Sequence, residues 1–538
     1  MDHRAIILGI DSGTSVVKAV AFDLEGQQLG CASVRNTYYR HIDGSALQCM
    51  DKTWQDCALA IRKLGEQIED LPRRVAAVSV TAQGDGSWFV DTHNRPRGQA
   101  WLWLDARAAG TVKNLEQHEL ALARFQATGT GLNTCQQGAQ LAFIESQYPE
   151  LLDSSDAVMH CKDWLYLNLT GVRATDPSEA SFTFGNFRTR RYDETVIEAL
   201  GLTHRRTLFP EIIEGTEVTH PLTEEAARVT GLLAGTPVCL GYVDMVMTAL
   251  GAGVFTGDAN TACSVIGSTG VHMRAVSNDD VYLNEARTGY VIALPSPGMV
   301  TQVQTNMAST LNLDWLLNIV QSLICQFGGQ VDHATLLQHI DRWLSESRPG
   351  SLMYHPYISL AGERGPFVNP DARASFIGLG YSHGFADMVR AIIEGMGMAA
   401  RDCYRAMGSA APEELRLSGG AIRSPQLRQI LGACIGAPVR NSTREEAGAA
   451  GAAMMAAVAI GVYPSISQCV DTWVTPLLGE REYPDAMLIE RYNALDVSYQ
   501  QSRDLLPPVW RDLQHLLPQQ LTPPVSDGTN IAAERSLK

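Results

Sequence analysis

Two nearly identical turns of glycine and hydroxyl residues occur in this chain, one in each half. The first lies in the stretch IILGIDSGTS, residues 6–15, and the second in ACSVIGSTG, residues 262–270. An apolar run with β character leads into each turn, and a second such run follows it. Glycine lets a ligand approach the backbone closely, and successive N–H groups with hydroxyls form a concavity that suits a phosphate. The repeat therefore predicts two related half-chains that hold one polyphosphate between them.

Length, charge and cysteine usage narrow the classes of protein to which the chain could belong. At 538 residues it is too long for one ordinary hydrophobic core, so we expect two large domains. A formal net charge of −16 argues against nucleic-acid binding and against an anionic membrane surface. The eleven cysteines are scattered, without a C-x-x-C pair or a metal-ligand cluster. Because no apolar run is long enough for a membrane span, we expect a cytoplasmic protein with free thiols.

The order of apolar patterns predicts an α/β fold with two similar domains around a central cleft. We place the first domain at residues 1–254 and the second at 255–470, because a new hairpin begins near Gly257. A C-terminal helical extension is expected over 471–517. Residues 518–538 are rich in Pro, Ser and Gln and show no periodicity, which predicts a disordered tail.

Hydrophobic periodicity predicts individual elements within these domains. Strands are expected at 28–35, 75–80, 88–91, 237–243 and 415–418. Helices are expected at 53–64, 108–122, 138–146, 163–169, 386–407, 425–435 and 447–460. The last of these is rich in small residues, so we expect it to pack very closely on its neighbours.

Six short motifs follow one another in a fixed order. They are DSGT from Asp11, QGDG from Gln83, WLWLDAR from Trp101, GYVD ending at Asp244, GSTG from Gly267 and LSGGA from Leu417. Neither the P-loop pattern nor the His-Arg-Asp loop of protein kinases is present. Over about residues 6–461 this ordered set resembles the FGGY family of carbohydrate kinases. The resemblance implies two actin-like, ribonuclease-H-like ATPase domains around the central cleft, with ATP and Mg²⁺ as cofactors.

The resemblance also assigns nucleotide-binding residues. The implied ATP-binding residues are Asp11, Ser12, Gly13 and Thr14 in the first turn, Gly267, Ser268, Thr269 and Gly270 in the second, and Gly419, Gly420 and Ala421 at the adenosine. Asp11 and Asp244 are the implied metal ligands. The alternative for the first turn is a plain hairpin in which Asp11 caps its own backbone. For Gly419 the alternative is an ordinary glycine turn between a strand and a helix.

Asp244 is the implied catalytic residue. It follows an apolar strand and precedes a helix, which is also where a helix N-cap would lie. In the family this position carries the catalytic Asp. A hydroxyl that attacks a phosphorus has to lose its proton, so a positioned carboxylate suits a general base.

The resemblance places the sugar on the N-terminal domain. The implied substrate-binding residues are Gln83, Asp85, Trp103, Asp105 and Arg107. Polyol recognition uses carboxylate acceptors, a forked donor and an aromatic wall against C–H faces. For Asp105 and Arg107 the alternative is an exposed salt bridge. In glycerol kinases the sequence of this loop is similar to Gln-Arg-Glu, and in xylulose kinases it is similar to Gln-Met-His-Gly. The Gln-Gly-Asp-Gly of this chain therefore implies a reshaped pocket.

Longer blocks resemble the erythritol kinases within the family. They are QGDGSW from Gln83, AWLWLDARAA from Ala100, TGTGLN from Thr128, HCKDWLY from His160 and ATDPSE from Ala174. They imply phosphorylation of a terminal hydroxyl of a small polyol, erythritol in particular. Lys162, Trp164 and Asp176 belong to these signatures. Helix packing is an equal alternative for Trp164, and Asp176 is a candidate to face the cleft.

Other interpretations stay open at this point. The substrate could be xylulose, ribulose, glycerol or a pentitol, and a non-catalytic actin-like ATPase would use the same clamp. Gly380, Ser382 and Gly384 match the nucleophile elbow of a serine hydrolase, but a cap for the following helix is favoured. A homodimer is compatible with the sequence.

Overall fold

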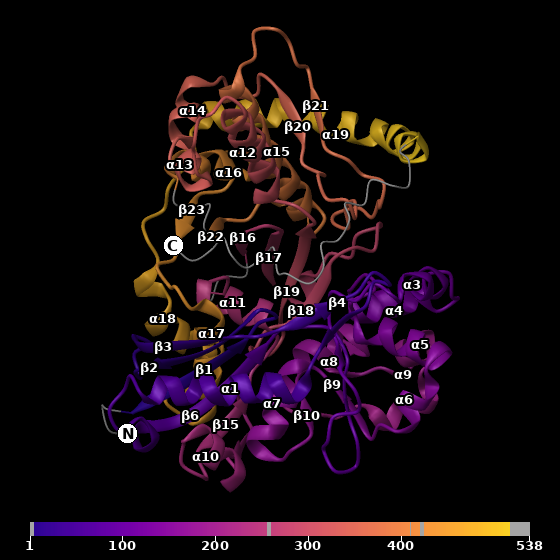
Figure 1. Cartoon of the computed structure of the whole chain (residues 1–538), viewed down its shortest axis with the longest axis vertical. Helices are drawn as coiled ribbons and strands as arrows, with labels where there is room; N and C mark the ends of the chain where they lie inside the picture. The colour runs from indigo at the N-terminus through magenta and orange to yellow at the C-terminus, as the bar shows by residue number, and fades with distance from the viewer. Residues whose placement is uncertain (1–4, 256–259, 409, 420–423, 517–538) are drawn as a thin grey trace.

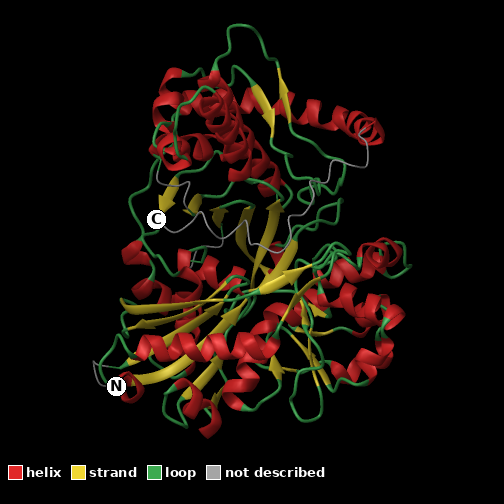
Figure 2. Ribbon diagram, in the orientation of Figure 1, coloured by secondary structure: helices red, strands yellow, loops and turns green. Residues whose placement is uncertain are grey.

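Two six-stranded sheets, one in each half of the chain, form the framework of the protein in this computed structural model (Figure 1). The structure describes residues 5–255, 260–408, 410–419 and 424–516. In Figure 2 the N-terminal half lies below and the C-terminal half above, each with its own sheet and its own helices.

The N-terminal sheet has the strand order β14-β15-β6-β1-β2-β3. Its strands are β1 (Ile6–Ser12), β2 (Val16–Phe22), β3 (Gln28–Arg35), β6 (Val75–Ala82), β14 (Thr219–Pro221) and β15 (Pro237–Leu240). β1, β2 and β3 form an antiparallel meander, and β6 and β15 run parallel to β1. β1 and β6 are buried along nearly their whole length, as expected for strands covered on both faces.

The C-terminal sheet repeats this arrangement, in the order β18-β19-β17-β16-β22-β23. Its strands are β16 (Thr261–Ile266), β17 (Gly270–Ser277), β18 (Tyr290–Ala293), β19 (Met299–Asn306), β22 (Glu414–Ser418) and β23 (Val439–Asn441). β16, β17 and β19 are antiparallel, and β22 and β23 run parallel to β16. The two glycine-hydroxyl turns are the equivalent β1–β2 and β16–β17 turns, which confirms the predicted duplication.

Most of the predicted helices are present. They are α1 (Met50–Gly65), α5 (Gln137–Gln147), α7 (Cys161–Thr170), α15 (Phe385–Arg405), α16 (Pro425–Ile435) and α17 (Ala447–Ala459). The predicted single helix over 108–122 is wrong, because this segment contains α3 (Ala109–Leu115) and the start of α4 (Ala121–Thr128). Between them the ring Nδ1 of His118 accepts a hydrogen bond from the backbone N–H of Leu120 at 3.2 Å. This local bond competes with helix continuation.

α17 and α11 (Asp244–Ala252) pack unusually closely. A Cβ added at Gly251 would lie 2.0 Å from the carbonyl oxygen of Ala447, and one added at Gly451 would lie 2.1 Å from that of Met247. α17 also lies on β1, where a Cβ at Gly9 would meet the Ala449 carbonyl oxygen at 2.0 Å. Glycine at these positions is therefore what lets α17, which follows the C-terminal sheet in sequence, cover the N-terminal sheet.

The remaining elements are shorter or peripheral. The helices are α2 (Leu71–Arg74), α6 (Pro149–Asp153), α8 (Pro177–Thr183), α9 (Glu194–Ala199), α10 (Glu224–Thr230), α12 (Thr310–Gln326), α13 (His333–Leu337), α14 (Ile340–Glu346), α18 (Ile466–Trp473) and α19 (Ala486–Leu516), with single 3-10 turns at Thr203–Leu208, Asn278–Asp280 and Thr475–Leu477. The small strands are β4 (Tyr38–Arg40), β5 (Ala46–Gln48), β7 (Trp88–Val90), β8 (Ala100–Trp101), β9 (Ala157–Met159), β10 (Ala174–Thr175), β11 (Gly185–Asn186), β12 (Arg191–Tyr192), β13 (Glu211–Ile212), β20 (Met353–His355) and β21 (Ser375–Ile377). α19 falls within the predicted C-terminal extension, whereas the predicted tail 518–538 lies outside the described residues. Within the described residues, the structure has no helix with the length and apolarity needed to cross a membrane.

Candidate active site

A cavity of about 310 Å³ lies between the two halves of the molecule. The N-terminal half contributes Thr14, Gln83, Gly84, Asp85, Trp103, Cys135, Asp244, Met245 and Thr248, and the C-terminal half contributes Val265, Thr269, Val271, Met273, Tyr290, Thr305 and Arg364. Side chains from both glycine-hydroxyl turns, Thr14 and Thr269, thus reach one cavity. Four residues of the predicted substrate and catalytic set, Gln83, Asp85, Trp103 and Asp244, line it as well.

The first turn is closed by a bond from the Gly13 N–H to the Val16 carbonyl oxygen at 3.0 Å. Asp11, at the end of β1, pairs in register with Lys18 on β2, whose Nζ lies 2.7 Å from Oε2 of Glu446. Burial raises the pKa of Asp11 to about 6, and the nearby Lys18 opposes that rise. Ser12 is buried in the same strand. No side-chain cap by Asp11 of its own turn is found among the described contacts.

Thr14 connects the first turn to the predicted sugar loop. Its hydroxyl donates to Oε1 of Gln83 at 2.8 Å and accepts from Nε1 of Trp103 at 2.9 Å. The Gln83 amide in turn donates to Oε1 of Gln48 at 2.7 Å. These bonds hold the predicted phosphate turn and the predicted substrate residues in one rigid network.

The loop Gly84–Asp85–Gly86 depends on its glycines. A Cβ at Gly84 would lie 2.5 Å from Cγ2 of Val243, and Gly86 has φ +76° with its Cβ position 2.5 Å from the Trp101 carbonyl oxygen. Asp85 itself has φ 54°. Its Oδ2 accepts from the Tyr290 hydroxyl at 3.4 Å, whereas the buried Oδ1 has no hydrogen-bond partner within the described part of the chain. A carboxylate oxygen with unused acceptor capacity therefore borders the cavity.

Asp244 is the first residue of α11, directly after Val243. Val243 occupies the N-cap position, so Asp244 is not the N-cap of α11, although its carboxylate accepts a hydrogen bond from the Met245 N–H. The Val243 N–H donates a hydrogen bond to the Ser178 hydroxyl at 3.0 Å. Burial, together with the carboxylates of Asp11, Glu179 and Asp85, raises the pKa of Asp244 well above its usual value.

The second turn is fixed by α12. The Gly267 N–H donates to the Thr269 carbonyl oxygen at 3.1 Å, and the Ser309 N–H donates to the Ser268 carbonyl oxygen at 2.8 Å. The Thr310 hydroxyl donates to the Gly267 carbonyl oxygen at 3.0 Å. Gly270 begins β17. These bonds occupy carbonyl oxygens at the start of the turn and leave Thr269 facing the cavity.

Asp105 and Arg107 pair with each other instead of lining the cavity. Nη2 of Arg107 lies 2.6 Å from Oδ2 of Asp105, which also accepts from the Ala46 N–H at 3.0 Å. The Arg107 guanidinium lies over the Trp101 ring, 3.4 Å from its centroid. The geometry is that of the salt-bridge alternative, but the pair is largely buried, with Asp105 1% exposed. Their predicted contact with substrate stays a prediction.

The adenosine motif is described only in part. Gly419 has φ +107°, and a Cβ there would lie 2.4 Å from the Ile266 carbonyl oxygen, so the position accepts only glycine without rearrangement. Gly420 and Ala421 lie outside the described residues.

Two models of one protein family together match most of the chain. A family model for the N-terminal domain of the FGGY family of carbohydrate kinases matches residues 6–251, and a model for its C-terminal domain matches residues 262–460. The chain belongs to the FGGY family of carbohydrate kinases. It is therefore an enzyme of the kinase class on a two-domain actin-like fold, and the hydrolase and non-catalytic interpretations are not supported.

Individual relatives agree with this assignment. An erythritol kinase of Brucella abortus (strain 2308) is 61% identical over 508 residues, covering 94% of this chain and 98% of the relative. A xylulose kinase of Escherichia coli (strain K12) is 29% identical, covering 95% and 99%. The crystal structure of a gluconate kinase from Lactobacillus acidophilus superimposes with a TM-score of 0.86 at 20% identity, covering 95% of this chain and 99% of that one.

The structure of this FGGY kinase adds site residues that the sequence reasoning missed. Tyr290, Arg364 and Cys135 line the cavity beside Asp85, and the Tyr290 hydroxyl lies 3.5 Å from Sγ of Cys135. Arg364 donates through Nε to the Thr305 hydroxyl at 3.2 Å. None of these residues belongs to a local motif. Only the tertiary structure brings the two C-terminal residues, Tyr290 and Arg364, to a loop of the N-terminal half.

Three signature residues of the kinase make contacts that stabilise the fold: Lys162, Trp164 and Asp176. Lys162 is fully buried between Asp163 and Asp176, at 2.7 Å and 2.5 Å. Asp176 caps α8 by accepting from the Ser178 N–H at 2.8 Å, so it does not face the cleft. The Trp164 indole donates to the Met50 carbonyl oxygen at 2.9 Å, as expected for packing.

Ser382 lies on an exposed turn before α15, where Gly384 is the N-cap and Asp387 accepts from its N–H at 3.0 Å. The helix is therefore capped by a neighbour of Ser382.

Among the described residues no group of three or more His, Cys, Asp or Glu side chains is arranged to hold a metal. Burial and the nearby carboxylate of Asp11 both raise the pKa of Asp244, so a cation at this position would favour the ionised form of Asp244. This excess of negative charge fits Mg²⁺ brought in with a polyphosphate.

Proposed function

We propose that this kinase transfers the γ-phosphoryl group of ATP to a terminal hydroxyl of erythritol. The observation that carries the proposal is the 61% identity with an erythritol kinase over 94% of the chain. The Gln83–Gly86 loop supports it, because it borders the cavity with a carboxylate oxygen that has no partner among the described residues. Such an oxygen suits a polyol hydroxyl, which is a hydrogen-bond donor.

The nucleotide has two cradles in this proposal. The residues that bind its phosphates are Asp11, Ser12, Gly13 and Thr14 on one side and Gly267, Ser268, Thr269 and Gly270 on the other, with Gly419, Gly420 and Ala421 at the adenosine. Asp11 and Asp244 would hold Mg²⁺, which supplies positive charge to the phosphates when bound. Support comes from Thr14 and Thr269, which line one cavity from opposite halves.

The polyol lies at the base of the cavity, in contact with Gln83, Asp85 and Trp103. Asp244 accepts the proton of the attacking hydroxyl, because it is a carboxylate on the same cavity wall. Asp105 and Arg107 stay in the proposal as substrate-binding residues, and the Arg107 guanidinium lies over the ring of Trp101, whose carbonyl oxygen borders Gly86 of the loop. Tyr290 and Arg364 of the C-terminal half complete the site beside Asp85.

Acceptor selectivity tests the proposal directly. ADP release is measured with erythritol, threitol, xylitol, glycerol, xylulose and ribulose under one set of conditions. We expect the highest kcat/KM with erythritol and a phosphorylated product at a terminal carbon by mass spectrometry and NMR. A higher kcat/KM with a ketose or with glycerol would replace erythritol by that acceptor.

We also propose a cytoplasmic location and a homodimer as the assembly. The eleven cysteines are all free in the structure, and eight of them are buried, which suits a reducing compartment. Light scattering on the purified protein measures the mass in solution, and a monomeric mass at micromolar concentration would exclude the dimer.

A further inference from the structure

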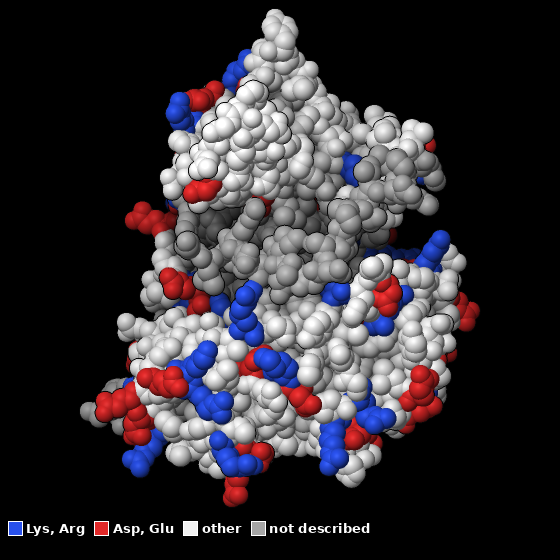
Figure 3. Space-filling view, viewed as in Figure 1, with Lys and Arg blue, Asp and Glu red and all other residues white. Residues whose placement is uncertain are grey.

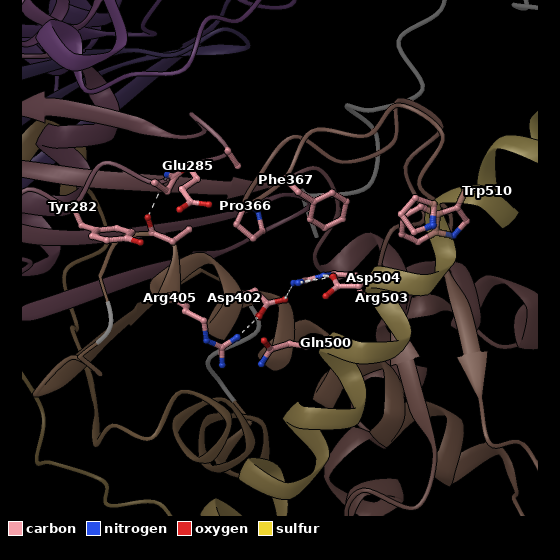
Figure 4. Close-up of a pocket in the computed structure, with 14 residues that line it drawn as sticks. Tyr282, Glu285, Pro366, Phe367, Asp402, Arg405, Gln500, Arg503, Asp504 and Trp510 are labelled. Carbon is pink, nitrogen blue, oxygen red and sulfur yellow. Dashed lines mark hydrogen bonds and ion pairs between the residues drawn. The ribbon is translucent and has the colours of Figure 1, made fainter. Parts of the chain in front are cut away.

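A second and larger cavity, of about 610 Å³, lies within the C-terminal half (Figure 4). Four segments of the chain form it, at 282–286, 366–367, 402–406 and 500–510, so it lies between the end of α15 and the last helix, α19. Among the residues that the structure describes, it shares no lining residue with the cavity between the halves. It is therefore a separate space with its own chemistry.

The lining of this cavity is polar but nearly balanced in charge. Asp402, 3% exposed, accepts from Nη1 of Arg405 at 2.6 Å and forms an ion pair with Arg503. Figure 4 shows these three side chains converging on one wall, with Gln500 beside them. Glu285 and Asp504 are the other charged residues of the lining within the described part of the chain. Because three carboxylates face two guanidinium groups, a strongly charged ligand gains little here, whereas a ligand with many neutral hydroxyls finds both donors and acceptors.

An aromatic pair lies beside these charged groups, with the guanidinium carbon of Arg503 5.7 Å from the centroid of the Phe367 ring. The rings of Phe367 and Trp510 are stacked, with centroids 6.4 Å apart and planes 7° from parallel. Trp510 is 1% exposed, and its Nε1 has no hydrogen-bond partner in the part of the chain that the structure describes. A buried indole N–H without a partner is costly, so a ligand oxygen that reaches it from the cavity, which Trp510 lines, gains a hydrogen bond. Aromatic faces beside donors and acceptors suit the C–H and O–H groups of a carbohydrate.

Two segments of this cavity continue into the candidate active site. The segment that carries Asn284 at the second cavity carries Tyr290 at the first, and the segment that carries Pro366 carries Arg364. The two segments are joined, because the Thr288 hydroxyl donates to the Pro366 carbonyl oxygen at 3.0 Å and the Asn284 amide donates to the Thr288 carbonyl oxygen at 3.0 Å. A ligand in the second cavity therefore contacts the same two segments that place side chains beside Asp85.

We propose that the second cavity binds a neutral polyhydroxylated ligand, a polyol or a sugar, and that its occupancy changes the affinity of the active site for its acceptor. By linkage, the acceptor must change the affinity of the second site by the same factor. Only the kinetic part of this proposal rests on the proposed function, since binding at the second cavity requires no turnover.

Binding is tested by calorimetry on the full-length protein without nucleotide, with erythritol, xylitol, sucrose and sodium phosphate as separate probes. We expect a site for at least one of the three neutral probes that is lost in Ala406→Trp, which fills the cavity, and weakened ~5-fold in Trp510→Phe, which removes the N–H and leaves a smaller aromatic ring in its place. Val509→Trp, at a 49% exposed position on the same helix outside the lining, is the matched control and should bind like the wild type.

Kinetic measurements distinguish two possible ligands of the second cavity, erythritol and a larger sugar. If erythritol occupies both sites, its saturation curve is non-hyperbolic in the wild type and hyperbolic in Ala406→Trp. If the occupant is a larger sugar, sucrose shifts the KM for the acceptor in the wild type and not in that variant. Should erythritol not be a substrate, the same measurement is made with the acceptor found in the ADP-release screen.

Three results would overturn the proposal. They are the absence of a second site for all three neutral probes, a second site that survives both Ala406→Trp and Trp510→Phe, and binding of phosphate alone. Thermal unfolding of each variant shows whether it is folded, and Trp510→Phe remains informative if Ala406→Trp does not fold.

Discussion

Asp244 lies in an environment that disfavours its charge, with the carboxylates of Asp11, Asp85 and Glu179 all raising its pKa. A raised pKa makes a carboxylate a stronger base, provided that it is ionised when the acceptor binds. The cation that accompanies the nucleotide would favour the ionised form of Asp244. The same residues that make the site unfavourable for negative charge thus suit it to a nucleotide–metal complex.

Asp244→Asn should lower kcat on the order of 10³-fold, because the amide cannot accept the proton of the attacking hydroxyl. The dissociation constant for ATP measured without Mg²⁺ should change less than about threefold, since the phosphate cradles are intact. Turnover is measured by ADP release and nucleotide affinity by calorimetry. Activity within tenfold of the wild type would exclude Asp244 as the base.

Lys18→Met should move the acidic limb of the pH–activity profile to higher pH. The pKa of Asp11 is about 6, and Lys18 holds it below the value that burial alone would give. Without this cation the carboxyl stays protonated to a higher pH, so Mg²⁺ binding is lost earlier as the pH falls. The apparent Mg²⁺ affinity is measured from pH 5.5 to 8, with Lys113→Met, an exposed lysine on α3, as the control. An unchanged profile would mean that Asp11 does not bind the metal.

At the scale of elements, α11 and α17 show how the two halves are joined. Their glycines let the helix backbones touch, and α17 continues this contact onto β1. The residues of α17 from Ala447 to Ala457 are all buried, and a Cβ at Gly448 would lie 2.4 Å from Oδ2 of Asp11, so the helix also packs against this carboxylate. Such packing has no side-chain freedom with which to absorb an added methyl group.

Gly251→Ala should therefore destabilise the protein by about 2 kcal/mol, because its Cβ position is 2.0 Å from the Ala447 carbonyl oxygen. Gly110→Ala is the matched control, since that Cβ on α3 meets nothing within 4 Å and removes a helix glycine. Denaturant unfolding of both variants gives the comparison. Equal stability of the two variants would contradict the close packing of α11 and α17.

The sequence could predict many of the helices, strands and turns, because these depend on local signals. The duplicated hairpins, the buried strand 75–80 and the small-residue helix at 447–460 all follow from periodicity and composition. The break between α3 and α4 did not, because it depends on one side-chain-to-backbone bond at His118. At the site, motifs indicated Thr14, Gln83, Asp85 and Asp244, but they could not show that Asp105 and Arg107 are paired away from the cavity.

At the scale of the whole molecule, the two halves differ in more than sequence. On the face shown in Figure 3, charged side chains gather over the N-terminal half, and the upper part of the C-terminal half carries few. The candidate active site lies between them, and its acceptor loop is contacted from the other half by Tyr290. Residues of the C-terminal half therefore take part in acceptor binding even though the sugar motifs lie in the N-terminal half.

Tyr290→Phe should raise the KM for the acceptor about five-fold with little change in the KM for ATP, because it removes a hydroxyl that donates to Asp85 and keeps the ring. Tyr483→Phe, at an exposed position, should leave both constants unchanged. Steady-state kinetics with varied acceptor and varied ATP separate the two effects. A change confined to ATP would show that Tyr290 acts on the nucleotide side.

The position of α17 has a consequence for how the polypeptide acquires its structure during synthesis. The helix that shields one face of the first sheet is encoded more than 400 residues after that sheet begins. Until α17 has been synthesised, β1 exposes Gly9 and its neighbours to water, so the N-terminal half cannot complete its fold. A protein truncated before Ala447 should for the same reason accumulate as aggregates and not as an isolated, well-folded first half.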